Sequence, residues 1–268
     1  MHWIVNTCLK REGGYEALIE QLDRQGVDYT LVRKPPFAEY LVAIHDEYDE
    51  QGQNKPIMLD IEGPVFVTGT TSMHAVSKAH GWSPGYIDSP CIRECIEHWG
   101  VEMLNHDSIF GSISEIIPVD EEFFIRPNVD SKSFAGTIMT KDKFESWRNS
   151  LLSIDSWTTI PPETEVIMCG VKKIWSEYRC SVVNGRVVTA SRYKTGTTVA
   201  YSNEVSDMII NYANDRVNEW NPRIAFTLDI AHTPDGLKVI ETNAISSSGF
   251  YALDMNKFVG EITALGKL

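Results

Sequence analysis

The sequence lacks the features that mark export or membrane insertion. Its start, MHWIVNTCLKREGG, has no basic segment followed by a long apolar stretch, and no apolar run approaches the roughly eighteen residues of a membrane span. Its five cysteines are an odd number, scattered through a chain of 268 residues that is large enough to need no covalent staples. We interpret them as reduced thiols and expect a cytoplasmic protein.

Positive charge is scarce relative to negative charge. The chain has 24 lysines and arginines against 37 aspartates and glutamates, a formal net charge of −13, which argues against a protein built to hold a nucleic acid duplex by its phosphates. Residues 69–72, Gly-Thr-Thr-Ser, lack the lysine and the spacing of a P-loop, so a plain helix N-cap is the better interpretation. No Ser-His-Asp or Cys-His arrangement stands out either.

The order of apolar segments predicts an α/β protein with two domains. Over residues 2–32 a strand, a helix and a second strand follow one another, which is the pattern of a β-α-β unit with a parallel sheet. We therefore expect residues 1–112 to form a small, doubly wound, Rossmann-like domain. From residue 113 onward strands and hairpins dominate, which predicts a second domain of α+β character over residues 113–268.

A hairpin is predicted over residues 225–243, AFTLDIAHTPDGLKVIETN. A three-residue loop that ends in glycine would set Thr233 opposite Leu237. Counting back along both strands places Asp229 opposite Glu241. Two carboxylates directly across a hairpin repel each other unless something positive lies between them.

The same register brings a third oxygen-bearing side chain to this face, because Asn243 falls opposite Thr227. Carboxylate and amide oxygens are hard ligands that suit Mg²⁺, which shares its shell with water and phosphates. A solvated acidic edge of the hairpin is the alternative. The other face is expected to turn toward the core and consists of Phe226, Leu228, Ile230 and Ile240.

A polar loop between two predicted strands has the composition of a phosphate-binding segment. Residues 122–126, EFFIR, form the first strand, and a loop with Ser131, Lys132 and Ser133 ends at Gly136. Such a loop can fold over a polyphosphate and donate backbone N–H groups and an ammonium. By itself the pattern fits an ordinary surface hairpin equally.

A second hairpin is signalled by Asn-Gly at residues 184–185, which lies between two alternating runs. Its two-residue loop puts Val183 opposite Arg186, so Glu177 falls opposite Arg192 and Arg179 opposite Ala190. Glu177, Arg179 and Arg192 would then share one face. This set is either a surface salt bridge or a clamp for a phosphate or a substrate carboxylate.

The order of these parts resembles the ATP-grasp superfamily over nearly the whole chain. The parts are the Rossmann-like domain, the lysine loop between strands, a strand suited to a nucleotide hinge, a hairpin with E-x-R, a long helix, and D…E-x-N on a last hairpin. FIRP…SKSFAG, WSEYR and ASRY further resemble a branch, frequent in phage genomes, that uses two arginines and a lysine around the triphosphate. The resemblance implies ATP-dependent and Mg²⁺-dependent ligation of a carboxylate to an amine through an acyl phosphate.

The resemblance also implies roles for single residues. Asp229, Glu241 and Asn243 would hold one or two Mg²⁺ ions, with Mn²⁺ as a substitute. Arg126, Lys132 and Arg179 would contact the phosphates. The segment 165–169 would be the hinge for adenine, and its nucleotide-binding residues, together with that of the E-x-R motif, would be Glu165, Ile167, Cys169 and Glu177.

The acid to be activated is expected in a cleft between the N-terminal domain, Arg192 and the loop 246–249, where Ser247 and Ser248 offer hydroxyls. With Arg179, Arg192 is the candidate for catalysis. The negative net charge favours an amino acid, a peptide or a protein terminus as the carboxylate partner. The acceptor amine is not specified by the sequence. A small-molecule kinase and a non-catalytic nucleotide-binding module remain alternatives.

Overall fold

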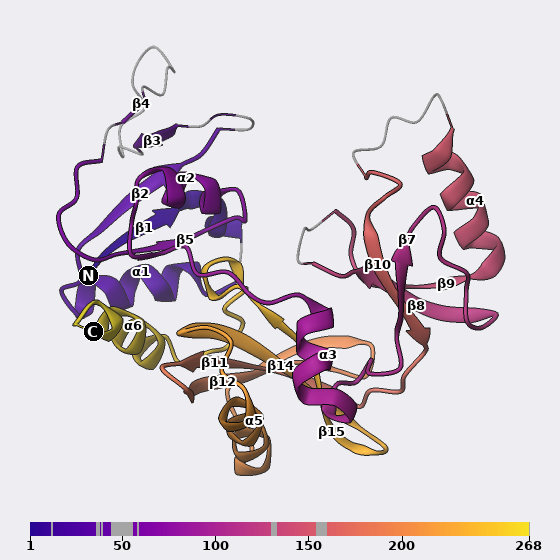
Figure 1. The fold of residues 1–268 in the computed structure, drawn as a ribbon. Helices are drawn as coiled ribbons and strands as arrows, with labels where there is room; N and C mark the ends of the chain where they lie inside the picture. Colours follow the sequence, from indigo (N-terminus) through magenta and orange to yellow (C-terminus); the bar gives the residue numbers. More distant parts are fainter. Residues whose placement is uncertain are drawn as a thin grey trace.

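The computed structural model describes residues 1–11, 13–35, 38, 40–43, 56–57, 59–129, 133–153 and 160–267. These residues form a mixed α/β fold built around three sheets, which occupy three separate parts of the molecule in Figure 1. Within these ranges no helix is long and apolar enough to cross a membrane.

The first sheet contains the N-terminal strands and is mainly parallel. In spatial order its strands are β4 (Pro56–Ile57), β3 (Leu41–Ala43), β2 (Tyr29–Arg33), β1 (His2–Asn6), β5 (Val65–Thr68) and β6 (Pro84–Gly85). β1 runs parallel to β2 and to β5, so the predicted β-α-β unit is present, with α1 (Tyr15–Arg24) as its helix. Alternation along β1 sends Trp3 to the core shared with α1, while Ile4 joins the core shared with α2 (Met73–Ala79).

The second sheet is antiparallel and has a hydrophobic core of its own. Its strands are β7 (Ile109–Ser112), β10 (Glu165–Gly170), β8 (Glu122–Pro127) and β9 (Thr137–Thr140), in that spatial order. α4 (Lys141–Leu152) begins at Thr140, whose side chain accepts a hydrogen bond from the Lys143 N–H, as an N-cap does. β7 lies on the N-terminal side of residue 112 and yet pairs with β10 in this sheet.

The third sheet is antiparallel and carries the two predicted hairpins. Its strands are β13 (Thr198–Ser202), β12 (Arg186–Thr195), β11 (Ser176–Val183), β14 (Ala225–Thr233) and β15 (Gly236–Asn243), in that spatial order. Buried side chains of β11, β14 and β15 form one core with α3 (Ile92–Trp99) and α5 (Asp207–Glu219). In Figure 1 both helices lie beside this sheet.

The turn between β11 and β12 has the predicted form. Asn184 and Gly185 both have positive φ, 48° and 76°, as a type I′ turn requires. Val183 pairs with Arg186, as expected from a two-residue loop.

Further along the same hairpin the predicted register was wrong. Two irregularities interrupt the pairing, and beyond them Glu177 lies opposite Lys194, while Arg192 lies opposite Tyr178. Arg179 pairs with Ser191 and not with Ala190. Each β-bulge inserts an extra residue into one strand, and this shifts every pair that follows.

The last hairpin, β14 and β15, reaches the predicted carboxylate pair by a different route. Thr233 pairs with Gly236 and not with Leu237, so the loop is one residue shorter than expected. A bulge near residue 240 then compensates, and Asp229 does lie opposite Glu241.

The bulge changes the side on which one apolar residue lies. Val239 pairs with Ile230 and is fully buried in the core with α5. Ile240, which was expected in that core, lines a cavity beside Glu241 instead. Thr227 pairs with Asn243 as predicted.

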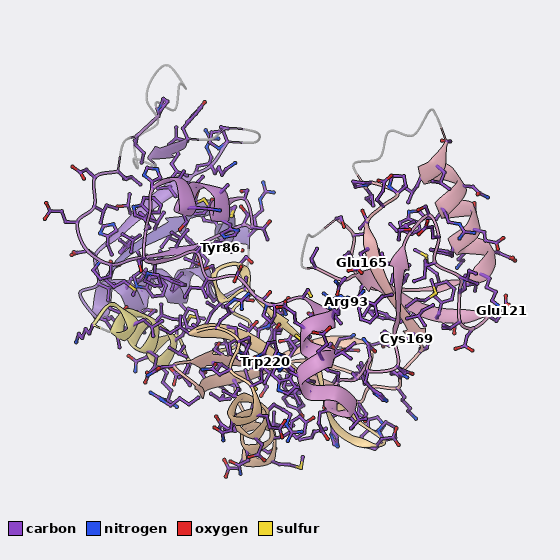
Figure 2. The ribbon with its side chains drawn as sticks, viewed as in Figure 1. Tyr86, Arg93, Glu121, Glu165, Cys169 and Trp220 are labelled. Atoms are coloured by element: carbon purple, nitrogen blue, oxygen red, sulfur yellow. The ribbon has the colours of Figure 1, made fainter. Side chains whose placement is uncertain are left out.

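Two joints connect the three sheets. The last helix, α6 (Met255–Ala264), packs against α1 and shares a core with the N-terminal strands. At the other joint, Arg93 of α3 forms an ion pair with Glu165 of β10, 2.5 Å between Nη2 and Oε1, as Figure 2 shows. Asn128 stands between them, because its Oδ1 accepts from the Arg93 N–H and its Nδ2 donates to Glu165 Oε2.

Candidate functional site

A cavity of about 860 Å³ lies between the second and third sheets. One wall comes from β8, β9 and the segment before β9, and the other from β11, β12 and β15. This volume is typical of a site for a small ligand of nucleotide size. Charged and amide side chains gather on its walls and consist of Asn105, Arg126, Lys172, Glu177, Lys194, Glu241 and Asn243.

An acidic centre stands where β14 and β15 meet this cavity. Asp229 is buried directly opposite Glu241. The amide nitrogen of Asn243 donates to Glu241 Oε1 at 3.1 Å and to Asp229 Oδ2 at 3.4 Å. The structure thus brings the three predicted metal ligands into contact with one another.

Arg179 neutralises one half of this centre. Its Nε and Nη2 donate to the two oxygens of Asp229 at 2.9 and 2.7 Å, a bidentate pair. Its Nη1 donates to the carbonyl oxygen of Gly249 at 3.3 Å. The guanidinium is nearly buried, with 8% of the Arg179 side chain exposed, and it is therefore held in one orientation.

Arg126 neutralises the other half from across the cavity. Its Nη1 donates to Glu241 Oε2, and this ion pair joins β8 to β15. Both side chains are mostly buried, 14% and 19% exposed, while both still line the cavity. The two predicted arginines therefore each hold one of the two carboxylates.

The two carboxylates respond differently to their burial. Burial raises the pKa of Asp229 because it disfavours the charged form, and the Arg179 guanidinium opposes this only in part. Burial acts in the same direction on Glu241, but the charge of Arg126 and the hydrogen bond from Asn243 outweigh it and lower the pKa of Glu241. Glu241 is therefore the carboxylate more firmly held in its charged form.

Glu177 is the centre of a second polar group on the cavity wall. Lys194 Nζ donates to its Oε1 at 2.6 Å, and the Tyr193 hydroxyl donates to its Oε2 at 2.8 Å. Burial raises the pKa of Tyr193, so this hydroxyl stays a donor at neutral pH. All three residues line the cavity.

Arg192 does not join this group. Its pairing with Tyr178 places it on the face of the sheet opposite to Glu177 and Arg179. It is absent from the cavity wall, and its Nε is buried without a hydrogen-bond partner among the described residues. The second bulge was invisible in the alternating sequence pattern, and Lys194 was missed for the same reason.

The predicted hinge residues also lie away from the cavity. Glu165 pairs with Arg93 and Asn128 at the start of β10. Ile167 and Cys169 are fully buried inside the sheet, and Cys169 Sγ contacts Asn105 Oδ1 at 3.3 Å. The cavity is lined instead by the segment that follows β10, through Val171, Lys172 and Ile174. Exposed hydrophobic residues just after a buried strand were the available signal.

The serines near the C-terminal helix hold the chain together. Ser248 is buried, and its hydroxyl donates to the carbonyl oxygen of Ala244 at 2.8 Å. The Ser247 hydroxyl accepts from the hydroxyl of Tyr86 in the N-terminal part at 2.8 Å. Neither serine lines the cavity.

The polar loop before β9 is described only in part. Lys132 falls in residues 130–132, outside the described residues. The part that follows, Phe134 to Gly136, does line the cavity. Around it lie apolar side chains that the sequence analysis did not single out, namely Phe124, Val129 and Ile138. They give one end of the cavity an apolar surface.

The chain belongs to an ATP-grasp family. A family model described as an ATP-grasp domain, family 3 of its clade, matches residues 57–262, which is most of the chain. This match includes the acidic centre, both arginines and the Glu177 group. No curated protein sequence matches the chain.

Solved structures show the same fold at low sequence identity. The D-cycloserine synthetase DcsG superposes with a TM-score of 0.65 and 9% identity, covering 99% of this chain and 100% of that one. The D-alanine–D-alanine ligase from Bacillus anthracis complexed with ATP gives 0.57 and 15%, covering 99% and 92%. A RimK domain ATP-grasp protein from Sphaerobacter thermophilus gives 0.58 and 12%, covering 92% of each chain.

Proposed function

We propose that this protein is an ATP-dependent ligase that joins a carboxylate to an amine through an acyl phosphate. The observation that supports this most is the meeting of Glu241, Asn243 and Arg126 on the wall of one cavity, in a chain of the ATP-grasp family. The ATP-bound ligase of similar fold agrees with ATP as the ligand of that cavity.

The acidic centre has the donors that a magnesium ion needs. Asp229 and Glu241 provide hard anionic oxygens, and Asn243 has an amide oxygen besides the nitrogen that contacts them. Within the described ranges no group of three His, Cys, Asp or Glu side chains could hold an ion, so the nucleotide phosphates would complete the shell. Mg²⁺, or Mn²⁺ in its place, would neutralise phosphate charge there.

The nucleotide would lie with its base at the apolar end of the cavity, against Phe124 and the segment after β10. Glu177 and Lys194 stand on the wall between that end and the acidic centre, and we assign them to the ribose and phosphates. We propose that Arg126 exchanges Glu241 for a phosphate oxygen when ATP binds, since the same guanidinium can reach either anion. Lys132 would add an ammonium from the loop above.

The reaction would consist of two displacements. A carboxylate oxygen of the substrate attacks the γ-phosphorus, and the bond to the β-phosphate oxygen breaks to release ADP. The amine nitrogen then attacks the acyl carbon, the bond to the phosphate oxygen breaks, and the amine loses a proton. Arg179 and Arg126 would stabilise the negative charge on the transferring phosphoryl group, which is the main task of the protein in such chemistry.

The proposed carboxylate partner is an amino acid, a peptide or a protein terminus, for which Arg179 and Gly249 mark the near wall. We leave Arg192 out of the site because it lies on the other face of the sheet. Ser247 and Ser248 are left out as direct contacts because their hydroxyls bond within the chain.

Isothermal titration calorimetry with ATP, with and without Mg²⁺, tests the first step. A screen of amino acids and peptides for ADP release, repeated with hydroxylamine to trap acyl phosphates, tests the second. We expect Mg²⁺-dependent binding and an acid-dependent hydroxamate. ADP release without a hydroxamate would identify a kinase. Binding without turnover on any acid would favour a binding module, and absence of Mg²⁺-dependent ATP binding would overturn the proposal.

A further inference from the structure

Tyr251 has a backbone conformation that bulky residues rarely adopt. Its φ is +50°, in the left-handed region, and among the described residues only Asn184 shares a positive φ without being glycine. Asn184 sits in a tight hairpin turn, where asparagine is common. Tyr251 begins a turn between Phe250 and Leu253, whose N–H donates to the Phe250 carbonyl at 3.1 Å. Glycine would fit this position more easily.

The neighbouring chain holds Tyr251 in this conformation. Phe250 is fully buried, and a side chain at Gly14 would come within 2.8 Å of its Cβ, so the two backbones approach closely. On the other side, the N–H of Ala252 donates to the Ser191 hydroxyl at 3.1 Å. A sparsely populated conformation persists only where its surroundings fix it, and such conformations gather at functional sites.

The Tyr251 ring contacts two tyrosines and one cation. It stacks on Tyr193 with ring centres 4.9 Å apart and lies 5.2 Å from the ring of Tyr201. The guanidinium carbon of Arg179 lies 4.8 Å from the centre of the Tyr251 ring and 5.8 Å from that of Tyr193. The unusual backbone thus delivers a ring to Arg179, with Tyr201 supporting it from β13.

We propose that Tyr251 is a positioning residue for Arg179. The ring restricts the guanidinium by a cation–π contact, while Asp229 and the Gly249 carbonyl bind its N–H groups. Arg179 is thereby held between the acidic centre and the loop that precedes α6. The catalytic consequence rests on the proposed function, since it requires Arg179 to act on the transferring phosphoryl group.

This role needs the aromatic ring and not the hydroxyl. A cation–π contact involves the ring face, which phenylalanine also has. Tyr251→Phe should therefore behave like the wild type. Tyr251→Gly relieves the backbone and removes the ring, and Tyr251→Asn does the same with a residue that also tolerates positive φ. Asn184→Gly is the matched control, because it relieves positive φ in a turn that does not line the cavity.

The first measurement requires no substrate and no nucleotide. The side-chain ¹⁵Nε–Hε signal of Arg179, assigned by its loss in Arg179→Lys, reports the ring current of Tyr251 and the protection of the Asp229 hydrogen bond. We expect Tyr251→Gly and Tyr251→Asn to shift this signal and to speed its hydrogen exchange, and Tyr251→Phe and Asn184→Gly to leave it in place. An unchanged signal in both ring-free variants would overturn the proposal, even if the protein proves to be a ligase.

The second measurement is turnover with an acid found in the ADP-release screen. A small misplacement of a catalytic group lowers the rate by about 10- to 100-fold, so we expect such a loss of kcat in Tyr251→Gly, a nearly unchanged KM for ATP, and recovery in Tyr251→Phe. Loss of kcat in Tyr251→Phe would assign the function to the hydroxyl and refute a ring-based role. If the wild type binds no ATP while the Arg179 signal responds as expected, the proposed ligase activity fails and the positioning of Arg179 stands.

Discussion

Arg126 of β8 and Glu241 of β15 form an ion pair that crosses from the second sheet to the third sheet inside the cavity. The same pair contains a proposed phosphate ligand and a proposed metal ligand. A cation at Glu241 and a phosphate at Arg126 would each replace one partner. Binding of both together would therefore leave neither charge unpaired.

Removal of Arg126 should expose this competition. Arg126→Gln leaves a mostly buried carboxylate without its cation, and we expect the free energy of unfolding to fall by about 2 kcal/mol without divalent ions. Mg²⁺ should then raise the melting temperature of the variant more than that of the wild type, as measured by calorimetry. Arg186→Gln is the control, because its pair with Glu261 is exposed. An equal response of variant and wild type to Mg²⁺ would contradict a metal at Glu241.

The bulge in β12 separates the roles of two neighbouring cations. Lys194 contacts Glu177 on the cavity wall, whereas Arg192 lies on the opposite face. We expect Lys194→Ala to weaken Mg·ATP binding by about tenfold, the loss of one charge-assisted contact. Arg192→Ala should leave the affinity unchanged by titration calorimetry. Weaker binding in Arg192→Ala alone would restore the pairing expected from the sequence.

Gly136 limits the size of the cavity at its apolar end. A Cβ at this position would lie 2.6 Å from Cζ of Phe124, so the ring would have to move, and both residues line the cavity. We expect Gly136→Ala to weaken ATP binding about tenfold with little change in the melting temperature. Gly13→Ala is the control, since nothing lies within 4 Å of its added Cβ. Equal affinities in the two variants would place the nucleotide elsewhere.

Asn128 connects α3 to the second sheet and should matter for stability. Its side chain bonds to Arg93 and Glu165, and its own N–H donates to the Glu165 carbonyl at 3.0 Å. Asn128→Ala leaves these buried groups without partners, which should cost about 1–3 kcal/mol of unfolding free energy. Urea denaturation measures the effect. An unchanged midpoint and slope would mean that the joint is held by packing alone.

Features written in local sequence were predictable. The Asn-Gly turn requires two residues with positive φ, and residues 184 and 185 have them. Thr140 was expected to cap a helix and does so. The acidic pair of Asp229 and Glu241 was also predicted, although two deviations from the expected register, a shorter loop and a bulge, cancelled each other.

Features that depend on neighbouring strands were not predictable from the chain alone. The bulge at Tyr193 turns its ring toward Tyr251 and moves Lys194 to Glu177, and both partners lie far from β12 or on another strand. The hydroxyls of the loop before α6 were expected to face a substrate, because serine alone does not reveal that Tyr86 and Ala244 would bind them. Period-two alternation carries no information about such insertions.

The four-stranded sheet with α4 is formed by one continuous stretch of chain, from β7 to β10, and its hydrophobic core contains residues of that stretch only. The other cores are made from distant parts of the chain, such as Trp3 with Phe258. The stretch can therefore act as an independent cooperative unit, which opens and exchanges its amide hydrogens without unfolding of the remainder. A ligand bound between this unit and the third sheet would couple their opening, so amides on β8 and on β15 would gain protection together.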